Sequence, residues 1–378
     1  MKVISHGGNT YDIFDDSLKV YEKLPPQVYA VRLSQQRGFF LEKCHDLDIK
    51  EKVYGVHNEK VEKVLSSFRR FDRNLGIILS GAKGIGKSLF AKMVAKSAIN
   101  NGIAVIIVDT FYNGIASYIE SIEDECVILF DEFDKTFGGI KAAEGTSDPQ
   151  AQMLSLFDGL STGKKMFIIT CNNYSTLNGY LINRPGRFHY HFRFNAPNAK
   201  EIEEYLMDKI DEKYYDEIKN VVAFSGRTEL NYDCLRAIAF ELQSGLSFPE
   251  AISDLNIVNV CGESYNLTLR FKNGFVMTAK NIRLDLFNDT DTFETVYMCD
   301  KYGNNVCDVD FRASEASYDY GMMAYVINSK GVKIDILTPE GADKRIKSYV
   351  ETYETIKSSD VECLIIRRNV SKDIHYTV

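Results

Sequence analysis

The sequence predicts an α/β fold in which a core on a parallel sheet is followed by a helical region and a β-rich region. Short apolar strands alternate with helix-period segments over residues 54–197, which is typical of a parallel sheet. Residues 198–256 carry helical periodicity without strands. Over residues 257–378, apolar runs that flank an Asn-Gly dipeptide indicate β-hairpins. We therefore expect four regions, the first being a preface of short strands over residues 1–53.

The composition is that of a globular protein. The 378 residues are 45% hydrophobic and 26% charged with seven Pro, which excludes collagen, coiled-coil rods and general disorder. The apolar runs fall far short of the roughly 20 residues of a membrane span, so we expect no such span. The eight Cys residues are scattered without a CxxC motif or zinc-ligand spacing. We expect reduced core residues in a cytoplasmic protein.

Residues 81–88 read GAKGIGKS and match the phosphate-binding motif GxxxxGK[ST] in full. An apolar strand over 76–79 precedes this P-loop and a helix over 87–99 follows it, which is the context that the motif requires. Glycines allow backbone N–H groups to turn towards a β-phosphate, and the helix N-terminus adds its dipole. We expect Lys87 to reach the β- and γ-phosphates of ATP, and Ser88 to hold Mg²⁺. The predicted nucleotide contacts of this loop are Gly81, Ala82, Lys83, Gly84, Ile85, Gly86, Lys87, Ser88 and Leu89.

A second apolar strand, residues 126–130, ends in the carboxylates of Asp131 and Glu132. The carboxyl ends of strands face the ligand crevice of an open α/β sheet. Asp131 is therefore expected to contact the nucleotide and, partly through water, to hold its Mg²⁺ together with Ser88. Glu132 is expected to orient and polarise the attacking water. The alternative is a solvated acidic turn.

A third apolar strand, residues 166–170, is followed by Asn172 and Asn173. An amide at this edge can hydrogen-bond a γ-phosphate and the attacking water, and Asn172 is the first candidate, with Asn173 the second. Further on, Arg184 and Arg187 flank a Pro-Gly turn. Guanidinium groups suit phosphate because they present several donors and keep their charge. Surface arginines without a partner are the alternative.

These four motifs, in this order and spacing, resemble those of the AAA+ ATPases, and within them the AAA clade. Details such as 130–134 (FDEFD) and 182–187 (INRPGR) are most like the mitochondrial Rieske-protein translocase group and short phage-encoded AAA ATPases. The dipeptide at 54–55 and the segment 156–159 (LFDG) also match boxes of the clade. The resemblance covers about residues 50–245.

The resemblance implies a five-stranded parallel sheet with a helical lid, and hydrolysis of ATP with Glu132 and Asn172 as catalytic residues. It also implies that Arg184 and Arg187 act in trans as arginine fingers within a ring of identical subunits, usually a hexamer. The chain departs from the clade where an acidic residue is missing from the segment before Arg184, which reads LNGYLIN. The lid motif has no clean match, and Arg236 is either a sensor-2 arginine or an exposed lid residue.

AAA remodellers usually pull on substrate with an aromatic residue in a loop after the second strand of the core. Phe111 and Tyr112 lie in that loop here, although the expected order of lysine, aromatic residue and glycine is not reproduced. They either line a central pore or pack against the helix that begins near Ile115. Residues 140–149 fall where a second pore loop would lie, but a linker predicts the same composition.

The expected function is a ring-forming ATPase that binds ATP and Mg²⁺ and remodels or translocates a protein. The net charge of −8, with acidic residues in excess in 257–378 and in the remainder, argues against nucleic acid as the partner. The region 257–378 carries no catalytic signature. We expect it to recognise a protein substrate or adaptor, or to assemble the ring. Two alternatives stay open: an ATP-gated assembly scaffold or switch, and a nucleic-acid motor or loader.

Overall fold

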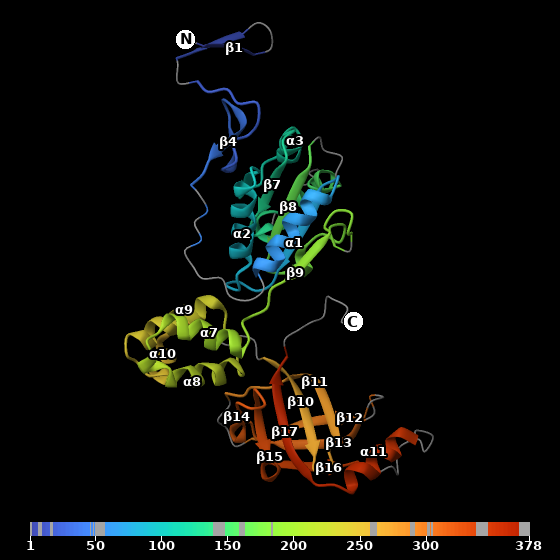
Figure 1. The fold of residues 1–378 in the computed structure, drawn as a ribbon. Coiled ribbons are helices and arrows are strands. Elements are labelled where there is room, and N and C mark those ends of the chain that lie inside the picture. Colours follow the sequence, from blue (N-terminus) through green and yellow to red (C-terminus); the bar gives the residue numbers. More distant parts are fainter. Residues whose placement is uncertain are drawn as a thin grey trace. The chain divides into compact units, whose positions relative to one another are not determined.

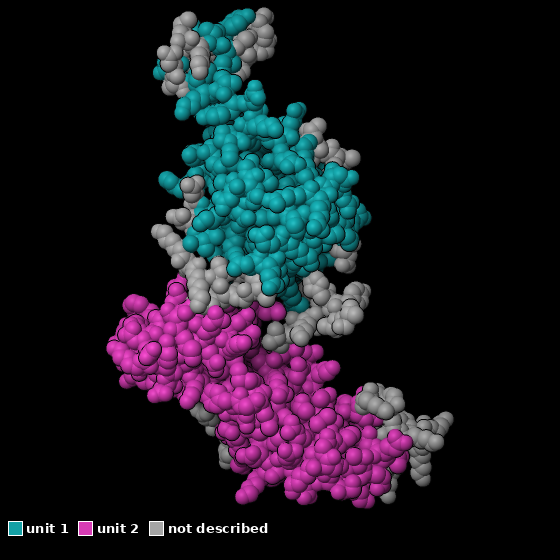
Figure 2. Space-filling view, in the orientation of Figure 1, with its two compact units in different colours: residues 1–194 teal, residues 195–378 magenta. Residues whose placement is uncertain are grey.

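The computed structural model describes residues 2–6, 10–15, 18–45, 47, 49, 57–138, 148–158, 163–182, 184–257, 263–287, 292–300, 303, 305–337 and 347–369. The chain divides into two compact units, 1–194 and 195–378, which Figure 2 draws in different colours. Each unit has hydrophobic cores of its own.

Unit 1 is built on a sheet with the strand order β4-β3-β6-β7-β8-β5-β9. Its strands are β3 (Val28–Ser34), β4 (Gly38–Lys43), β5 (Leu75–Ser80), β6 (Ala104–Val108), β7 (Cys126–Phe130), β8 (Lys165–Cys171) and β9 (Tyr190–Arg193). Strands β5 to β9 pair in parallel, and every residue of β5, β7 and β8 is buried. Continuous buried strands are typical of parallel sheets covered on both faces. The predicted α/β fold class is confirmed.

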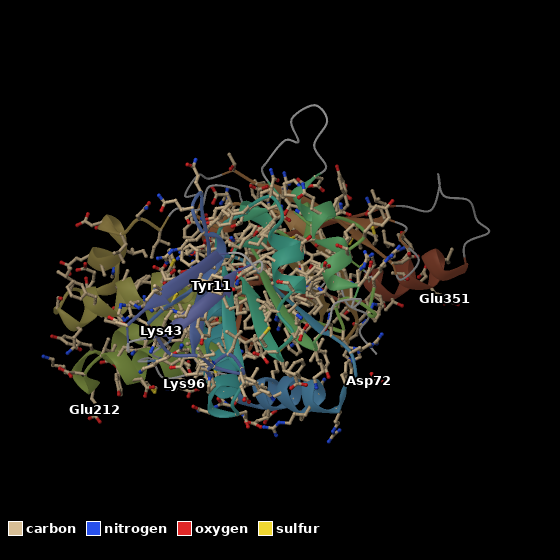
Figure 3. The ribbon with its side chains drawn as sticks, turned by 90° about the horizontal axis from the view of Figure 1, so that it is seen from above. Tyr11, Lys43, Asp72, Lys96, Glu212 and Glu351 are labelled. Carbon is tan, nitrogen blue, oxygen red and sulfur yellow. The ribbon has the colours of Figure 1, made fainter. Side chains whose placement is uncertain are left out.

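Helices cover both faces of this sheet (Figure 1). They are α1 (His57–Arg70), α2 (Lys87–Asn100), α3 (Ile115–Glu120), α4 (Phe133–Thr136), α5 (Pro149–Gln152) and α6 (Leu154–Phe157). Phe68 of α1 and Phe90 of α2 pack on one face with Ile77, whereas Phe157 of α6 packs on the other face with Ile78. Adjacent residues of β5 thus enter opposite cores, as the period of a strand requires. Charged residues such as Lys96 of α2 point outward (Figure 3).

The sheet is longer than the five parallel strands that the resemblance implies. β3 pairs in parallel with β6, and β4 pairs antiparallel with β3, so two strands of the preface extend the core sheet. The apolar segment 28–31 is buried there, and Phe39 of β4 stacks on Tyr118 of α3 with ring centroids 5.0 Å apart. The expected strand number is therefore corrected, because the preface hairpin completes the core. β1 (Lys2–His6) and β2 (Thr10–Phe14) pair in a separate two-stranded sheet.

Three neighbouring parallel strands of unit 1 end at one edge of the sheet. β5 ends at Ser80, which pairs with Cys171 at the end of β8, and Phe130 at the end of β7 pairs with Ile169. The segments that follow these strands carry the three predicted polar motifs. Since the carboxyl ends of parallel strands meet at the same edge, the fold brings the motifs together.

Unit 2 begins with a group of helices. The described helices here are α7 (Ala199–Lys209), α8 (Asp216–Ser225), α9 (Tyr232–Gln243) and α10 (Phe248–Asp254). α7 begins with a capping box, in which Asn198 and Glu201 each accept a hydrogen bond from the other's backbone N–H. The buried residues Leu206, Val222 and Leu235 come from the apolar faces of these helices. The predicted helical region is confirmed.

The rest of unit 2 is an antiparallel sheet with the strand order β14-β15-β17-β10-β11-β12-β13-β16. Its strands are β10 (Ser264–Phe271), β11 (Val276–Arg283), β12 (Glu294–Cys299), β13 (Asn305–Phe311), β14 (Ser317–Asp319), β15 (Ala324–Asn328), β16 (Val332–Ile336) and β17 (Val361–Arg368). Alternate residues of β10 enter the core, beginning with Tyr265 and ending with Phe271. Ile356 of α11 (Lys347–Lys357) joins the same core. The predicted β-rich region is confirmed.

Hydroxyl groups of tyrosines join the helices of unit 2 to its sheet. Tyr325 of β15 donates a hydrogen bond of 2.8 Å to the carbonyl oxygen of Ala223, and Tyr265 of β10 donates one of 2.7 Å to that of Arg227. These carbonyls lie at the C-terminal end of α8 and just beyond it, where a helix leaves C=O groups without intrahelical partners. The contacts tie the end of α8 to two strands of the sheet.

Candidate nucleotide-binding site

Three glycines give the loop between β5 and α2 its shape. Gly81, Gly84 and Gly86 have φ values of +144°, +71° and +95°, a range that favours glycine. A Cβ atom at Gly81 would also lie 2.3 Å from the carbonyl oxygen of Phe194. Ile85 is 2% exposed and anchors the loop in the core. The predicted P-loop therefore adopts a conformation that its glycines alone allow.

The N-terminus of α2 opens on this loop without a side-chain cap. Gly86 is its N-cap residue, and the helix has no side-chain capping hydrogen bond from that position. Uncapped N–H groups at a helix N-terminus are donors for an anion. Ala82 and Lys83 are exposed at the tip of the loop, and Leu89 is half-buried on α2. The loop and helix start thus offer backbone donors to a phosphate.

Lys87 is 7% exposed, and its ammonium group bonds to the chain itself. Its Nζ donates hydrogen bonds of 2.7 Å and 2.6 Å to the carbonyl oxygens of Gly81 and Ala82, and one of 3.0 Å to Oδ1 of Asn172. Burial lowers the pKa of the Lys87 ammonium below its ordinary value. A phosphate entering the loop would offer this ammonium group a negatively charged acceptor in place of neutral ones.

Ser88 and Asp131 are the two residues whose side-chain oxygens are predicted to hold Mg²⁺. The Oγ of Ser88 donates a hydrogen bond of 3.3 Å to Oδ1 of Asp131, which follows β7. Hydroxyl and carboxylate oxygens are hard ligands of the kind that Mg²⁺ prefers. The donor set therefore fits Mg²⁺ bound to a nucleotide.

Glu132 follows Asp131 in a left-handed backbone conformation, with φ 48° and ψ 47°. One of its carboxylate oxygens, Oε1, accepts a hydrogen bond of 3.4 Å from Nδ2 of Asn172 and forms an ion pair with Lys135. The hydrogen bond from Lys135 holds the pKa of the Glu132 carboxyl below its ordinary value. Glu132 is thus ionised at neutral pH and lies beside the amide of Asn172.

The structure distinguishes the two asparagines after β8. The Asn172 side chain lies between Lys87 and Glu132 and bonds to both. The Asn173 side chain instead caps the short 3₁₀ turn Tyr174–Thr176, where it accepts hydrogen bonds from the N–H and hydroxyl of Ser175. Asn172, the first candidate, is the one that faces the other predicted site residues.

The two arginines of the RPGR segment differ in their surroundings. Arg187 makes a bidentate ion pair with Asp158 and donates a hydrogen bond of 2.6 Å to the carbonyl oxygen of Tyr180, and its side chain is 10% exposed. Arg184 is exposed, with its guanidinium 5.6 Å from the centre of the Tyr180 ring. Within one chain, Arg187 is engaged and Arg184 faces solvent.

Sequence reasoning missed two residues that hold the site together. The hydroxyl of Thr170 donates a hydrogen bond of 2.6 Å to Oδ1 of Asp131 and accepts one of 2.8 Å from the backbone N–H of Glu132. Oδ2 of Asp134 accepts backbone hydrogen bonds from Asn172 and Asn173, both of 3.0 Å. Both residues stand within two positions of predicted ones, and for Thr170 a polar side chain in an apolar strand was the available signal.

Phe111 and Tyr112 pack within the chain. The ring of Phe111 contacts that of Phe137 edge-on, with centroids 5.6 Å apart, and the ring of Tyr112 contacts that of Phe39 with centroids 6.1 Å apart. Both side chains are half-buried. These contacts favour the packing alternative over a pore-lining role.

Some predicted features lie elsewhere. Arg236 is exposed on α9 in unit 2, with its guanidinium 3.6 Å from Asp233 of the same helix. The dipeptide at 54–55, Gly159, Asn183 and most of 140–149 lie outside the described residues. Within the described part of the chain, no helix is both long and apolar enough to cross a membrane.

Residues 77–196 match the family model for the ATPase family associated with various cellular activities (AAA). The chain is 29% identical over 174 residues to the ATP-dependent zinc metalloprotease FtsH of Aster yellows witches'-broom phytoplasma, a match that covers 40% of this chain and 25% of that protein. It is 26% identical over 213 residues to the 26S proteasome regulatory subunit 10B of Dictyostelium discoideum, covering 51% of this chain and 54% of that protein. Among solved structures, the Thermotoga maritima RuvB Holliday junction branch migration motor aligns with a TM-score of 0.39 and 14% identity, over 53% of this chain and 69% of that one.

The chain thus spans a quarter to about half of the length of these curated relatives. The family match begins inside β5 and ends just after β9, so it includes the loop, the two turns and the arginine segment of the site. The chain contains an AAA ATPase domain, with homologues among the AAA ATPases.

Proposed function

We propose that this chain hydrolyses ATP to ADP and phosphate with Mg²⁺ and, as a ring of identical subunits, remodels or translocates a protein substrate. One observation supports the ATPase part most directly. Lys87, Ser88, Asp131, Glu132 and Asn172 lie in the segments that follow three separate strands, and hydrogen bonds link them at one edge of the sheet. Their residue types are those that bind and cleave a nucleoside triphosphate.

In this proposal the P-loop binds the phosphates. Lys87 leaves the carbonyl oxygens of Gly81 and Ala82 and donates to the β- and γ-phosphate oxygens, while N–H groups at the start of α2 bind the same phosphates. Ser88 and Asp131 hold Mg²⁺, Asp131 in part through water. When bound, the Mg²⁺ ion neutralises charge that develops on the phosphate oxygens.

Glu132 and Asn172 act on the attacking water. The ionised Glu132 carboxylate accepts a hydrogen bond from the water and polarises it, and the Asn172 amide orients the water and the γ-phosphate. In the structure Lys135 occupies the Glu132 carboxylate and lowers its pKa, which makes it a weaker base. We infer that Glu132 exchanges Lys135 for water when the site is loaded.

The arginine segment is assigned to the neighbouring subunit of the ring. Arg184 faces solvent and can reach a neighbour's ATP directly, whereas Arg187 first has to leave Asp158 or else acts by holding this segment in place. Mixing two inactive variants tests the ring. Lys87→Ala loses ATP binding but keeps Arg184, and Arg184→Ala loses the finger but keeps the site. Activity recovered on mixing supports action in trans, and no recovery from co-assembled variants contradicts it.

A protein substrate is proposed on two grounds. The curated relatives include a protease and a proteasome subunit by name, and acidic residues exceed basic ones along this chain. The β-rich part of 257–378 is the proposed surface for substrate, adaptor or ring assembly. ATPase rates measured with unfolded casein, single-stranded DNA or RNA distinguish a protein substrate from a nucleic-acid one. Stimulation by nucleic acid alone would contradict the protein-substrate proposal.

An ATP-gated scaffold is the remaining alternative. Glu132→Gln distinguishes it, because a scaffold needs ATP binding alone, whereas a remodeller needs turnover. Affinity capture with Glu132→Gln and ATP should retain both the ring and a trapped substrate. Recovery of a monomer under these conditions would contradict the ring, and full biological activity of the variant would favour the scaffold.

A further inference from the structure

The turns after β7 and β8 are tied to each other by two side chains, one from each side. Thr170 belongs to β8, is 1% exposed, and reaches the turn after β7. Its hydroxyl donates to the side chain of Asp131 and accepts from the backbone N–H of Glu132. A valine has nearly the same shape, so packing alone would not require the hydroxyl.

Asp134 makes the opposite connection. It belongs to α4, in the turn after β7, and its Oδ2 accepts the backbone N–H groups of Asn172 and Asn173 in the turn after β8. A carboxylate that accepts two N–H bonds fixes the position of both peptide groups. The turn after β7 is therefore held by Thr170 of β8, and the turn after β8 by Asp134 of α4.

We propose that Thr170 and Asp134 are positioning residues that form a reciprocal clamp, so that Glu132 and Asn172 move as one body. The inference rests on the proposed ATPase function. Contact of Asn172 with a γ-phosphate would then reposition Glu132 at the same time, through two short polar connections. The clamp also holds Asp131 next to Ser88, so metal binding is coupled to the same movement.

Hydrogen exchange tests the clamp without relying on catalysis. Thr170→Val removes the acceptor of the Glu132 amide, so exchange should accelerate in the turn after β7, not at the substituted strand. Asp134→Ala should accelerate exchange at Asn172 and Asn173 in the turn after β8. Thr278→Val, the same change at an exposed strand position of unit 2, serves as the control. Acceleration confined to the neighbourhood of each substitution would overturn the clamp.

Kinetics test the positioning role. Thr170→Val and Asp134→Ala should each lower kcat by about 10- to 100-fold, because small displacements of positioned groups carry penalties of this size. KM for ATP should change much less than kcat does, since the P-loop is intact. Thr170→Ser keeps the hydroxyl and should restore most of kcat, and Asp134→Asn keeps one acceptor oxygen and should restore part. A loss that Thr170→Ser does not restore would contradict the role of the hydroxyl.

A double-mutant cycle decides whether the two residues form one device. If they do, Thr170→Val combined with Asp134→Ala should be little slower than the worse single variant. If the losses in kcat of the two single variants multiply in the double variant, the two contacts are independent and the proposal is overturned.

Should Thr170→Val not fold, exchange at Asn172 and Asn173 in Asp134→Ala and Asp134→Asn still tests the clamp. Absence of ATP turnover in the wild type would refute the ATPase proposal, while the crossed exchange pattern would still decide the clamp.

Discussion

The Nζ atom of Lys87 donates a hydrogen bond of 3.0 Å to Oδ1 of Asn172, which connects the P-loop to the turn after β8. The other contacts of this ammonium group are the carbonyl oxygens of Gly81 and Ala82. Because an ammonium has three donors, all of them are engaged with the chain. A phosphate that binds Lys87 therefore has to replace at least one of these three hydrogen bonds.

Lys87→Met is expected to weaken ATP binding by about 100-fold, because it removes the charged donor to the β- and γ-phosphates. Titration with a fluorescent ATP analogue measures this affinity. Lys96→Met, on the exposed face of the same helix, is the matched control and should bind as the wild type does. Equal affinities of the two variants would show that Lys87 does not contact the nucleotide.

Substitution of Arg184 and of Arg187 should have different effects on the free energy of unfolding. Arg187→Ala removes the ion pair with Asp158, and we expect it to lower the free energy of unfolding by about 1 kcal/mol, since Asp158 is partly solvated. Arg184→Ala should change it by less than about 0.5 kcal/mol and act only on ATP turnover in the assembled ring. Urea unfolding of both variants provides the comparison. Equal stabilities would contradict the different surroundings of the two side chains.

The ion pair of Asp158 also predicts a pH dependence. Hydrogen bonds from Arg187 lower the pKa of Asp158 below its ordinary value of 3.8. A carboxyl with a lowered pKa contributes stability above its ordinary pKa, and this contribution is lost as the pH falls through the folded-state value.

Asp158→Asn should therefore be less stable than the wild type from pH 7 down to about pH 4, with the difference shrinking only below that range. Urea unfolding over this pH range measures it, with Asp72→Asn as the exposed control. A difference that closes between pH 7 and pH 5 would assign the effect to another group.

The contact between the end of α8 and the sheet of unit 2 predicts a steric effect at Gly226. A Cβ atom there would lie 2.9 Å and 3.0 Å from ring carbons of Tyr318 and Tyr325. Gly226→Ala should lower the free energy of unfolding of unit 2 by about 1–3 kcal/mol, because both rings must shift. Gly179→Ala, where a Cβ has nothing within 4 Å, is the control. Unchanged denaturation of Gly226→Ala would contradict the tight packing of α8 against the sheet.

The residues that bind nucleotide could be predicted because their types occur at fixed spacings after apolar strands. Lys87, Asp131 and Asn172 each follow a strand of a parallel sheet, and topology brings such positions to one edge. The P-loop could be recognised because its glycines have positive φ values, which few other residues adopt.

Other features depend on which strands are neighbours, and the sequence carries no direct record of that. The contact of Thr170 with Asp131 exists because β7 lies beside β8. The addition of β3 to the sheet required β6 to offer a free edge. The pairing of Arg187 with Asp158 likewise joins segments 29 residues apart. Such contacts arise from tertiary packing rather than from local pattern.

The rate of phosphate release from Mg²⁺-ATP by the wild type and by Glu132→Gln tests the central claim most directly. We expect the wild type to turn over, and Glu132→Gln to bind ATP with unchanged affinity but lose at least about 100-fold in rate, because the water loses its general base. Glu59→Gln, exposed on α1, should behave as the wild type does. Hydrolysis by Glu132→Gln at the wild-type rate, or no hydrolysis by the wild type, would contradict an ATPase site built on Glu132.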